Sequence, residues 1–366
     1  MRQAVVLSSA KDLHSVDQMY SPFPVEDMSM RVAYRELQDT LRRVLAGKGM
    51  SPERAELSSR LFADASADGV PSHGLNRFPL FVSCIDRGLV DVAATPACTA
   101  SFGALERWNG RSGPGNLNAH QCMDRAIALS RSHGIGAVAL AATNHWMRGG
   151  AYGWQAATAG VVGICWTNTL PNLPPWGSTL PRIGNNPLVI AVPRATGHVV
   201  LDMAMSQFSY GALSVHRMRG SELPVDGGYD ETGRLTRDPA AIEATGRLLP
   251  VGYWKGSALA IVLDMIATLL SGGRATHEIT GGVADETGQS QVFLAIDPSI
   301  HGAADEMTSA VDRIIEHLHA AGDGVRYPGE RTLETRQRSL TGGVEVEPSI
   351  WEEVKALLTR GSASKS

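Results

Sequence analysis

The 366-residue sequence is poor in cysteine. Its four cysteines, Cys84, Cys98, Cys122 and Cys165, are far apart, which excludes a disulfide scaffold and the close ligand spacing of a zinc site. No metal is therefore expected. Each cysteine stands among apolar neighbours, so we expect reduced thiols packed in the core.

Charge of one sign is not concentrated anywhere along the chain. The 33 Lys and Arg residues face 37 Asp and Glu residues, a formal charge of −4, and no long basic run could follow a phosphate backbone. Nucleic acid is not an expected partner. The apolar run at residues 4–7 is followed too soon by charged residues for a signal peptide or a membrane span. We expect a cytoplasmic protein with no membrane partner.

Common nucleotide and hydrolase motifs are also missing. The sequence has no Gly-x-Gly-x-x-Gly, Walker A, His-Glu-x-x-His or Gly-x-Ser-x-Gly pattern. The run at residues 134–139 matches a looser dinucleotide pattern, but its glycines precede an apolar strand instead of following one. A Rossmann dinucleotide site is therefore excluded.

The residues present predict an α/β protein with a large core, since 43% are hydrophobic. Residues 257–270 are apolar almost all round, so we expect that helix inside the protein or in a subunit interface. Helical spacing predicts helices near residues 31–46, 51–62, 117–132, 151–159, 257–270, 303–321 and 349–359. Short apolar runs predict strands at residues 137–142, 161–166, 188–192, 198–203 and 291–296.

Reactive side chains crowd into the Gly- and Pro-punctuated segment 68–78. Reduction of a ketone needs a proton for the developing alkoxide, and His73 is a suitable donor near neutral pH. Arg77 offers a planar fork that could hold a carboxylate. The alternative is an ordinary turn between helices, with a hydrogen-bonded histidine and a surface arginine.

A second polar segment, residues 144–150, follows the predicted strand 137–142. His145 and Arg148 could face a substrate or a cofactor phosphate there, because ligands often bind at strand ends. The next helix would also point its amide N–H groups toward the site. A turn with a packed aromatic residue beneath it would give the same pattern.

Three weaker candidates follow. Residues 166–187 combine small polar side chains with a rigid aromatic loop, which suits a pocket for a hydroxylated ligand or a nicotinamide. Asp202 interrupts an apolar strand and could support a histidine, although an exposed carboxylate fits equally well. Lys255 could hold a pyrophosphate at a helix start or simply face solvent. Spacing alone leaves an α/β enzyme of unknown reaction.

Longer runs carry a resemblance. Ser72-His73-Gly74, Asn144-His145-Trp146-Met147-Arg148-Gly149-Gly150 and Gly252-Tyr253-Trp254-Lys255-Gly256-Ser257 closely resemble the type 2 malate/L-lactate dehydrogenase family. The resemblance spans roughly residues 31–358. It implies a non-Rossmann α/β fold with a mixed central sheet, flanking helices and interlocked subdomains, in a homodimer that binds NADH or, less often, NADPH.

The resemblance also implies roles for individual residues. It assigns the proton donor to His73, while some relatives give the acid/base role to the histidine that falls on His145, and Asp202 joins the catalytic group. The cofactor residues implied are His198, Val199, Val200, Leu201, Asp202, Met203, Ala204, Trp254, Lys255, Gly329, Glu330 and Arg331. At the last three positions the chain has Gly-Glu-Arg where the family branch has Gly-His-Glu. The segment 194–199 also differs and is one residue longer.

One catalytic unit is expected over residues 30–360. Residues 110–270 would bind NAD, and residues 30–109 and 271–360 would serve the substrate and the dimer. A poorly ordered extension over residues 1–29 and a tail over residues 361–366 complete this division.

The implied reaction is NADH-dependent reduction of a ketone in 2,3-diketo-L-gulonate to 3-dehydro-L-gulonate. His73 would protonate the oxygen and Arg77 would hold the carboxylate. The alternatives are malate, lactate or ureidoglycolate dehydrogenation, cyclic imino acid reduction, and a silent protein that binds small acids. A hydrolase that pairs Ser72 with His73 or His145 is a further alternative, against which the missing motifs argue.

Overall fold

The computed structural model describes residues 30–360, apart from residues 283–284 and 302–303. The expected extension and tail therefore lie outside the described residues. A seven-stranded mixed sheet forms the centre, in the order β2-β3-β4-β10-β5-β6-β7, with two small two-stranded ladders beside it. Only the β3–β4 pair is parallel, so the sheet has no Rossmann topology.

The strands are β1 (Met30–Val32), β2 (Ala97–Phe102), β3 (Leu105–Asn109), β4 (Ile135–Asn144), β5 (Val162–Thr167), β6 (Leu188–Val192), β7 (Val199–Met203), β8 (Gly228–Tyr229), β9 (Leu235–Thr236), β10 (Thr287–Ile296) and β11 (Val344–Val346). The α-helices are α2 (Tyr34–Gly47), α3 (Pro52–Ala67), α4 (Phe78–Asp86), α5 (Gly115–His133), α6 (Gly150–Thr158), α7 (Tyr210–Met218), α8 (Pro239–Thr245), α9 (Trp254–Ser271), α10 (Ala304–His319), α11 (Glu330–Gly342) and α12 (Pro348–Arg360). Short 3₁₀ turns include Pro71–His73 and Leu75–Arg77.

The predicted helices and strands are all present. Ser51 caps α3 by accepting the N–H of Arg54, and Pro52 occupies the first turn. Gly134 ends α5 in the left-handed conformation, with φ at 79°, and β4 begins at the next residue. The sequence patterns missed β2 and β3, which extend one edge of the sheet, and α11, which begins beside β7. They also missed four short strands and three helices, namely β1, β8, β9, β11, α4, α7 and α8.

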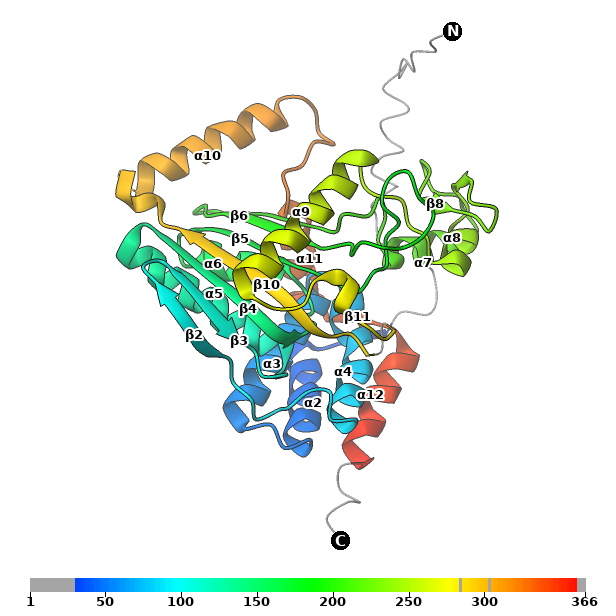
Figure 1. Ribbon diagram of the computed structural model, residues 1–366, viewed down its shortest axis with the longest axis horizontal. Coiled ribbons are helices and arrows are strands. Elements are labelled where there is room, and N and C mark those ends of the chain that lie inside the picture. Colours follow the sequence, from blue (N-terminus) through cyan, green and yellow to red (C-terminus); the bar gives the residue numbers. More distant parts are fainter. Residues whose placement is uncertain (1–29, 283–284, 302–303, 361–366) are drawn as a thin grey trace.

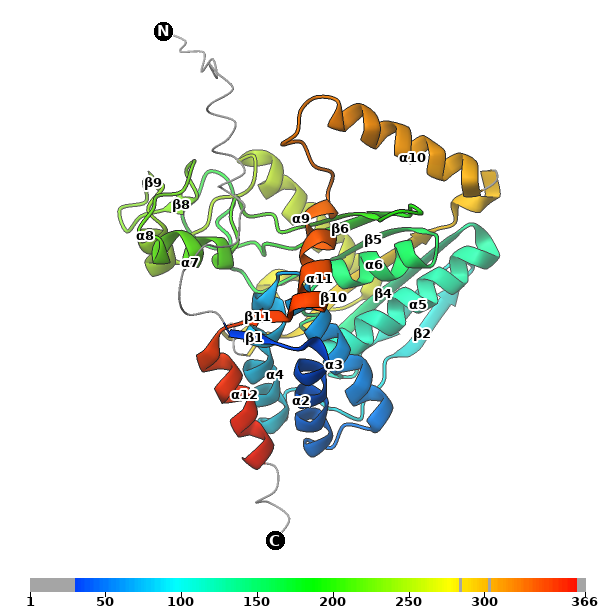
Figure 2. The same ribbon diagram turned by 180° about the vertical axis from the view of Figure 1, so that it is seen from behind.

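Helices cover the two faces of the sheet unequally. On one face α5 packs on β4 and β10 while α6 packs on β5 and β6, as Figure 2 shows. A buried apolar core fills that layer, with Trp146, Tyr152 and Phe293 in mutual ring contact. The other face is crossed obliquely by α9 (Figure 1).

A separate helical layer lies below the sheet in Figure 1 and joins the two ends of the described chain. It contains α2, α3, α4 and α12, and the β1–β11 ladder closes over it. Its core is centred on Phe62, whose ring lies 5.2 Å from that of Phe78 and 5.3 Å from that of Phe81. This layer carries the Pro71–His73 turn toward the sheet.

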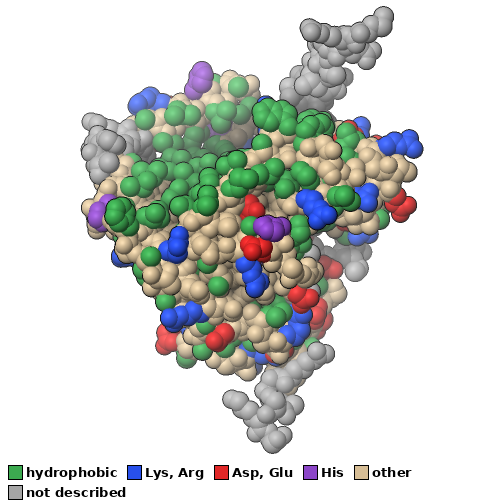
Figure 3. All heavy atoms as spheres, viewed as in Figure 1, with side chains coloured by type: hydrophobic (Ala, Val, Ile, Leu, Met, Phe, Trp, Pro, Cys, Tyr) green, Lys and Arg blue, Asp and Glu red, His purple; other side chains and the backbone are tan. Residues whose placement is uncertain are grey.

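The α9 helix lies on the surface of the chain, so the expectation of an interior position is wrong. Its side chains at Trp254, Val262, Met265 and Leu269 are exposed by 61%, 48%, 57% and 75%. Figure 3 shows hydrophobic side chains gathered in a band over this helix and the adjoining part of the sheet. The α9 helix is long and apolar enough to cross a membrane, but core helices of soluble proteins can be equally long and apolar. The subunit-interface alternative remains open.

All four cysteines are free thiols. Cys122 and Cys165 are buried, as expected, but Cys84 is only partly buried and Cys98 is exposed. The expectation of a core position for Cys98 is wrong because it lies on the edge strand β2, which was not recognised in the sequence.

We expect Phe62→Ala to lower the free energy of unfolding by about 3 to 5 kcal/mol, because it removes a ring that is 1% exposed. Phe102→Ala is the matched control, since that ring is 87% exposed, and it should change stability by less than about 0.5 kcal/mol. Urea unfolding of both variants measures the difference. Equal effects would contradict this account of the core.

Candidate active site

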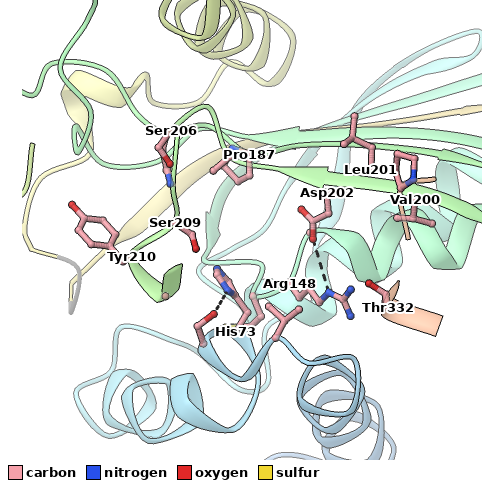
Figure 4. A pocket seen from close by; sticks show the side chains of 18 of the residues that line it. His73, Arg148, Pro187, Val200, Leu201, Asp202, Ser206, Ser209, Tyr210 and Thr332 are labelled. Atoms are coloured by element: carbon pink, nitrogen blue, oxygen red, sulfur yellow. Dashed lines mark hydrogen bonds and ion pairs between the residues drawn. The ribbon is translucent and has the colours of Figure 1, made fainter. Parts of the chain in front are cut away.

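A cavity of about 1690 Å³ opens between the helical layer, the ends of β4, β5 and β7, and α11. Its walls include His73, Arg77, His145, Arg148 and Asp202, so the structure brings both polar segments to one place. In Figure 4, Asp202 and Arg148 lie on one side of His73, while Ser206 and Ser209 lie on the other. The volume exceeds that of an ordinary small-ligand pocket and suits a dinucleotide beside a small acid.

His73 lies at the end of a 3₁₀ turn with its ring inside the cavity. Its Nδ1 and the Oγ of Ser72 are 3.1 Å apart. Burial lowers the pKa of His73, and the negative charge of Asp202 opposes that shift. The charge of Asp202 thus favours the imidazolium form of His73, while Arg77 and Arg148 disfavour it.

His145 stacks on His73, with 5.8 Å between the ring centroids. Its Nδ1 lies 3.0 Å from the backbone nitrogen of Met147 and accepts that N–H. Burial holds the pKa of His145 well below its usual value, and the charges of Arg77 and His73 lower it further. His145 is therefore neutral, with its proton on Nε2, and can act as a hydrogen-bond donor.

Asp202 is held by two groups from the turn that follows β4. Its Oδ2 accepts the N–H of Gly150 at 2.8 Å and lies 3.9 Å from the Nε of Arg148. The carboxylate thus caps the first turn of α6. The sequence predicts that the N–H groups of this turn point at a ligand, but one of them is taken by Asp202. Asp202 is exposed in the cavity, as one of the two alternatives expected, and its charge acts on His73 through space without a hydrogen bond between the two.

Arg148 is buried and pairs with Asp68, whose other partner is Arg336 at 2.6 and 2.7 Å. Asp68 ends α3, Arg148 follows β4 and Arg336 lies on α11, so three distant segments meet at one carboxylate. This network fixes the backbone beside His145 and Asp202. Apart from its place in the polar segment 68–78, no sequence pattern indicates this role of Asp68.

Glu286 is a cavity residue that the sequence patterns missed. It stands immediately before β10, and its carboxylate accepts the N–H of Leu170 at 3.0 Å. Burial raises the pKa of Glu286, while the Leu170 N–H and the charge of Arg77 oppose that shift. In the sequence Glu286 lies between Asp285 and Thr287, and this run carries no motif that could have revealed it.

The cofactor positions implied by the resemblance divide into two groups. Val200, Leu201, Asp202, Ala204, Gly329 and Arg331 line the cavity. There α11 starts without a side-chain cap, and Gly329, at φ 96°, approaches β7 so closely that a Cβ would lie 3.1 Å from the nitrogen of Val200. The uncapped N–H groups of α11 could hold a phosphate.

The remaining cofactor positions do not line the cavity. His198 contacts the ring of Trp154, and the carboxylate of Glu330 accepts the N–H of Tyr327. Val199 and Met203 lie within β7. Trp254 and Lys255 are exposed at the start of α9.

The segment 166–187 contributes polar walls. Thr169, Asn172 and Asn185 line the cavity and hydrogen-bond to one another, with the Thr169 Oγ1 and the Asn185 Oδ1 3.1 Å apart. Trp166 is buried and donates to the carbonyl of Leu263, so it supports the fold. Among the described residues no His, Cys, Asp and Glu side chains cluster as a metal site would require.

Comparison with known proteins places this geometry in a family. A sequence profile described as malate/L-lactate dehydrogenase matches residues 32–355. The chain belongs to the malate/L-lactate dehydrogenase family. It is therefore an oxidoreductase that acts on small hydroxy or keto acids with a nicotinamide cofactor. The resemblance seen in the sequence is confirmed, and so are the mixed sheet and the missing Rossmann topology.

Relatives cover nearly the whole described chain. A 2,3-diketo-L-gulonate reductase from Citrobacter koseri is 46% identical over 335 residues, which is 90% of this chain and 100% of that protein. The delta1-piperideine-2-carboxylate reductase structure from Pseudomonas syringae is 30% identical, with a TM-score of 0.81, and the match covers 90% of this chain and 99% of that one. The sulfolactate dehydrogenase structure from Methanocaldococcus jannaschii is 25% identical, with a TM-score of 0.85 and coverage of 91% and 98%.

We expect Asp202→Asn to shift the pH profile of ketone reduction to lower pH. A protonated His73 is present below its pKa and is lost as pH rises through it, and the charge of Asp202 raises that pKa. Asparagine keeps an oxygen for the N–H of Gly150 but removes the charge. The pH at which kcat/KM falls on the alkaline side of the profile should decrease by about one unit.

Glu231→Gln, at an exposed position, is the charge-matched control and should leave this pH unchanged. An unchanged pH in Asp202→Asn would show that Asp202 does not support the charged form of His73.

Proposed function

We propose that the chain is an NADH-dependent 2,3-diketo-L-gulonate reductase that forms 3-dehydro-L-gulonate. The observation that carries the proposal is the 46% identity to relatives of that name over their whole length. The cavity supports it, because Arg77 offers a guanidinium for a carboxylate and Thr169, Asn172 and Asn185 offer polar groups for hydroxyls.

Proton transfer is proposed to come from His73. When bound, the nicotinamide supplies the hydride that reduces the carbonyl carbon. His73, as an imidazolium supported by Asp202, gives a proton to the carbonyl oxygen, so the ketone becomes an alcohol. His145 stays neutral and donates a hydrogen bond from Nε2. The charges around each ring support this division: Arg77 disfavours the charged form of both rings, but Asp202 favours the charged form of His73 and no carboxylate does so for His145.

The cofactor is proposed to lie along β7 and the start of α11. Val200, Leu201, Gly329 and Arg331 line that part of the cavity, and the first turn of α11 offers N–H groups to a pyrophosphate. NADH is the proposed electron donor and NADPH the alternative. Trp254 and Lys255 remain proposed cofactor residues at the surface end of α9.

We expect His73→Ala to lower kcat for ketone reduction by about two to four orders of magnitude, because it removes the proton donor. Stopped-flow measurement of NADH oxidation at saturating substrate reads this directly. His133→Ala, at an exposed position at the end of α5, should keep the original rate. An unchanged kcat in His73→Ala would remove the assignment.

A panel of keto acids tests the substrate. We expect the highest kcat/KM for NADH oxidation with 2,3-diketo-L-gulonate, above that with pyruvate, oxaloacetate and a cyclic imino acid. A reversed order would favour one of the other family activities. Binding of sugar acids without NADH oxidation by any of them would instead favour a silent binding protein.

We also propose a cytoplasmic homodimer in which a second copy covers the apolar face of α9. The face is formed by Val262, Met265 and Leu269, and one interface of ordinary size would bury all three. An exposed band of this kind is costly in a monomer that works in water.

We expect the Met265→Glu, Leu269→Glu double variant to sediment as a monomer at micromolar concentration, because two charges would be buried unpaired at the interface. Met218→Glu, on α7 and 66% exposed, is the matched control and should sediment like the original protein. If the double variant sediments with the same mass as the original protein, the dimer interface lies elsewhere.

A further inference from the structure

Glu286 is a half-buried residue whose carboxylate the proposed reaction does not use. It lines the main cavity together with Arg77 and His145, and the same three residues line a small pocket that adjoins it. The hydrogen bond from the N–H of Leu170 holds the carboxylate of Glu286 just beyond the carboxyl end of β5. A half-buried acid beside the group that would hold the substrate carboxylate must affect how that anion binds.

The charges around Glu286 are few. Arg77, from the Leu75–Arg77 turn, has no hydrogen bond or ion pair with any described residue. Burial lowers the pKa of Arg77 and the charge of Glu286 raises it, so the two charges attract each other across the cavity. His145, from the turn after β4, is neutral, and α4 contributes the Cys84 thiol. In this part of the cavity the positive charge of Arg77 therefore balances the negative charge of Glu286.

The neighbouring charged groups do not alter this balance. His73 does not interact directly with Glu286, because its pKa responds to the charges of Asp202, Arg77 and Arg148 and not to that of Glu286. Asp285, the preceding residue, pairs with Arg87 at the surface. The partner of Glu286 in electrostatic terms is thus Arg77.

We propose that binding of the substrate carboxylate to Arg77 is coupled to uptake of one proton by Glu286. The inference rests on the proposed function only in taking the substrate to be a carboxylate. The proton comes from solvent, no covalent bond to the substrate forms, and the carboxylate of Glu286 becomes a neutral acid. One of its oxygens can still accept the N–H of Leu170.

The physical reason is the competition of two anions for one cation. When the substrate carboxylate reaches Arg77, two carboxylates share a poorly solvated site, and one of them is favoured in its protonated form. Glu286 is the one already biased toward protonation by burial. Proton uptake makes affinity fall as pH rises, by up to about tenfold per pH unit between the pKa of Glu286 in the free and bound states.

Calorimetry measures the coupling directly. The original protein with saturating NAD⁺, which cannot reduce a ketone, is titrated with 2,3-diketo-L-gulonate in buffers of different ionisation enthalpy. At the pH of greatest uptake we expect about 0.5 to 1 proton bound per site. In Glu286→Gln the uptake should fall by about that amount, and the affinity should lose most of its dependence on pH. Asp285→Asn, one residue away, is the matched control and should keep the uptake of the original protein.

Two results would overturn the proposal: no proton uptake by the original protein, or equal uptake by it and by Glu286→Gln. The first measurement needs no variant, so a Glu286→Gln protein that fails to fold leaves the test intact. If the keto acid panel selects a different carboxylate substrate, the same titration is made with that acid. Failure of the substrate assignment and failure of the proton coupling are thus read separately.

Discussion

The site depends on the buried ion pairs of Asp68 with Arg148 and Arg336. Three segments that are far apart in sequence end at this carboxylate: the helical layer, the turn after β4, and α11. Removing one partner would leave charge buried without compensation, which is far more costly than losing a surface pair. Because Arg148 also lies beside Asp202, the same network sets where the negative charge stands relative to His73. The electrostatics of the cavity thus depend on these buried ion pairs.

The two histidines illustrate how neighbouring charges separate chemically identical groups. Both residues are partly buried, their rings stack, and Arg77 lowers the pKa of both, yet only His73 has a carboxylate among its charged neighbours. The sequence could name both histidines but could not rank them, since the ranking depends on Asp202, which comes from another part of the chain. Their proposed roles follow from three-dimensional placement and not from motif identity.

Most of the longer helices and five strands of the central sheet were predictable, because their signals are local. Gly134 and Ser51 marked boundaries that the structure reproduces, and the strand at residues 188–192 has the bounds expected. Local signals failed where the environment is set by distant residues. The α9 helix looks like an interior helix in sequence but lies at the surface, and Glu286 acquires its character only because β10 places it beside Arg77.

The absence of a glycine-rich fingerprint has a physical counterpart in the sheet. A Rossmann site needs a parallel strand followed by a tight turn into a helix, and the glycines serve that turn. Here β7 pairs antiparallel with β6 at the sheet edge, and the helix start beside it belongs to α11, more than a hundred residues later. The close approach is made instead by Gly329, which lies against the backbone of Val200. A glycine is still required where a helix start meets a strand, but the two partners no longer adjoin in sequence, so no short motif can record them.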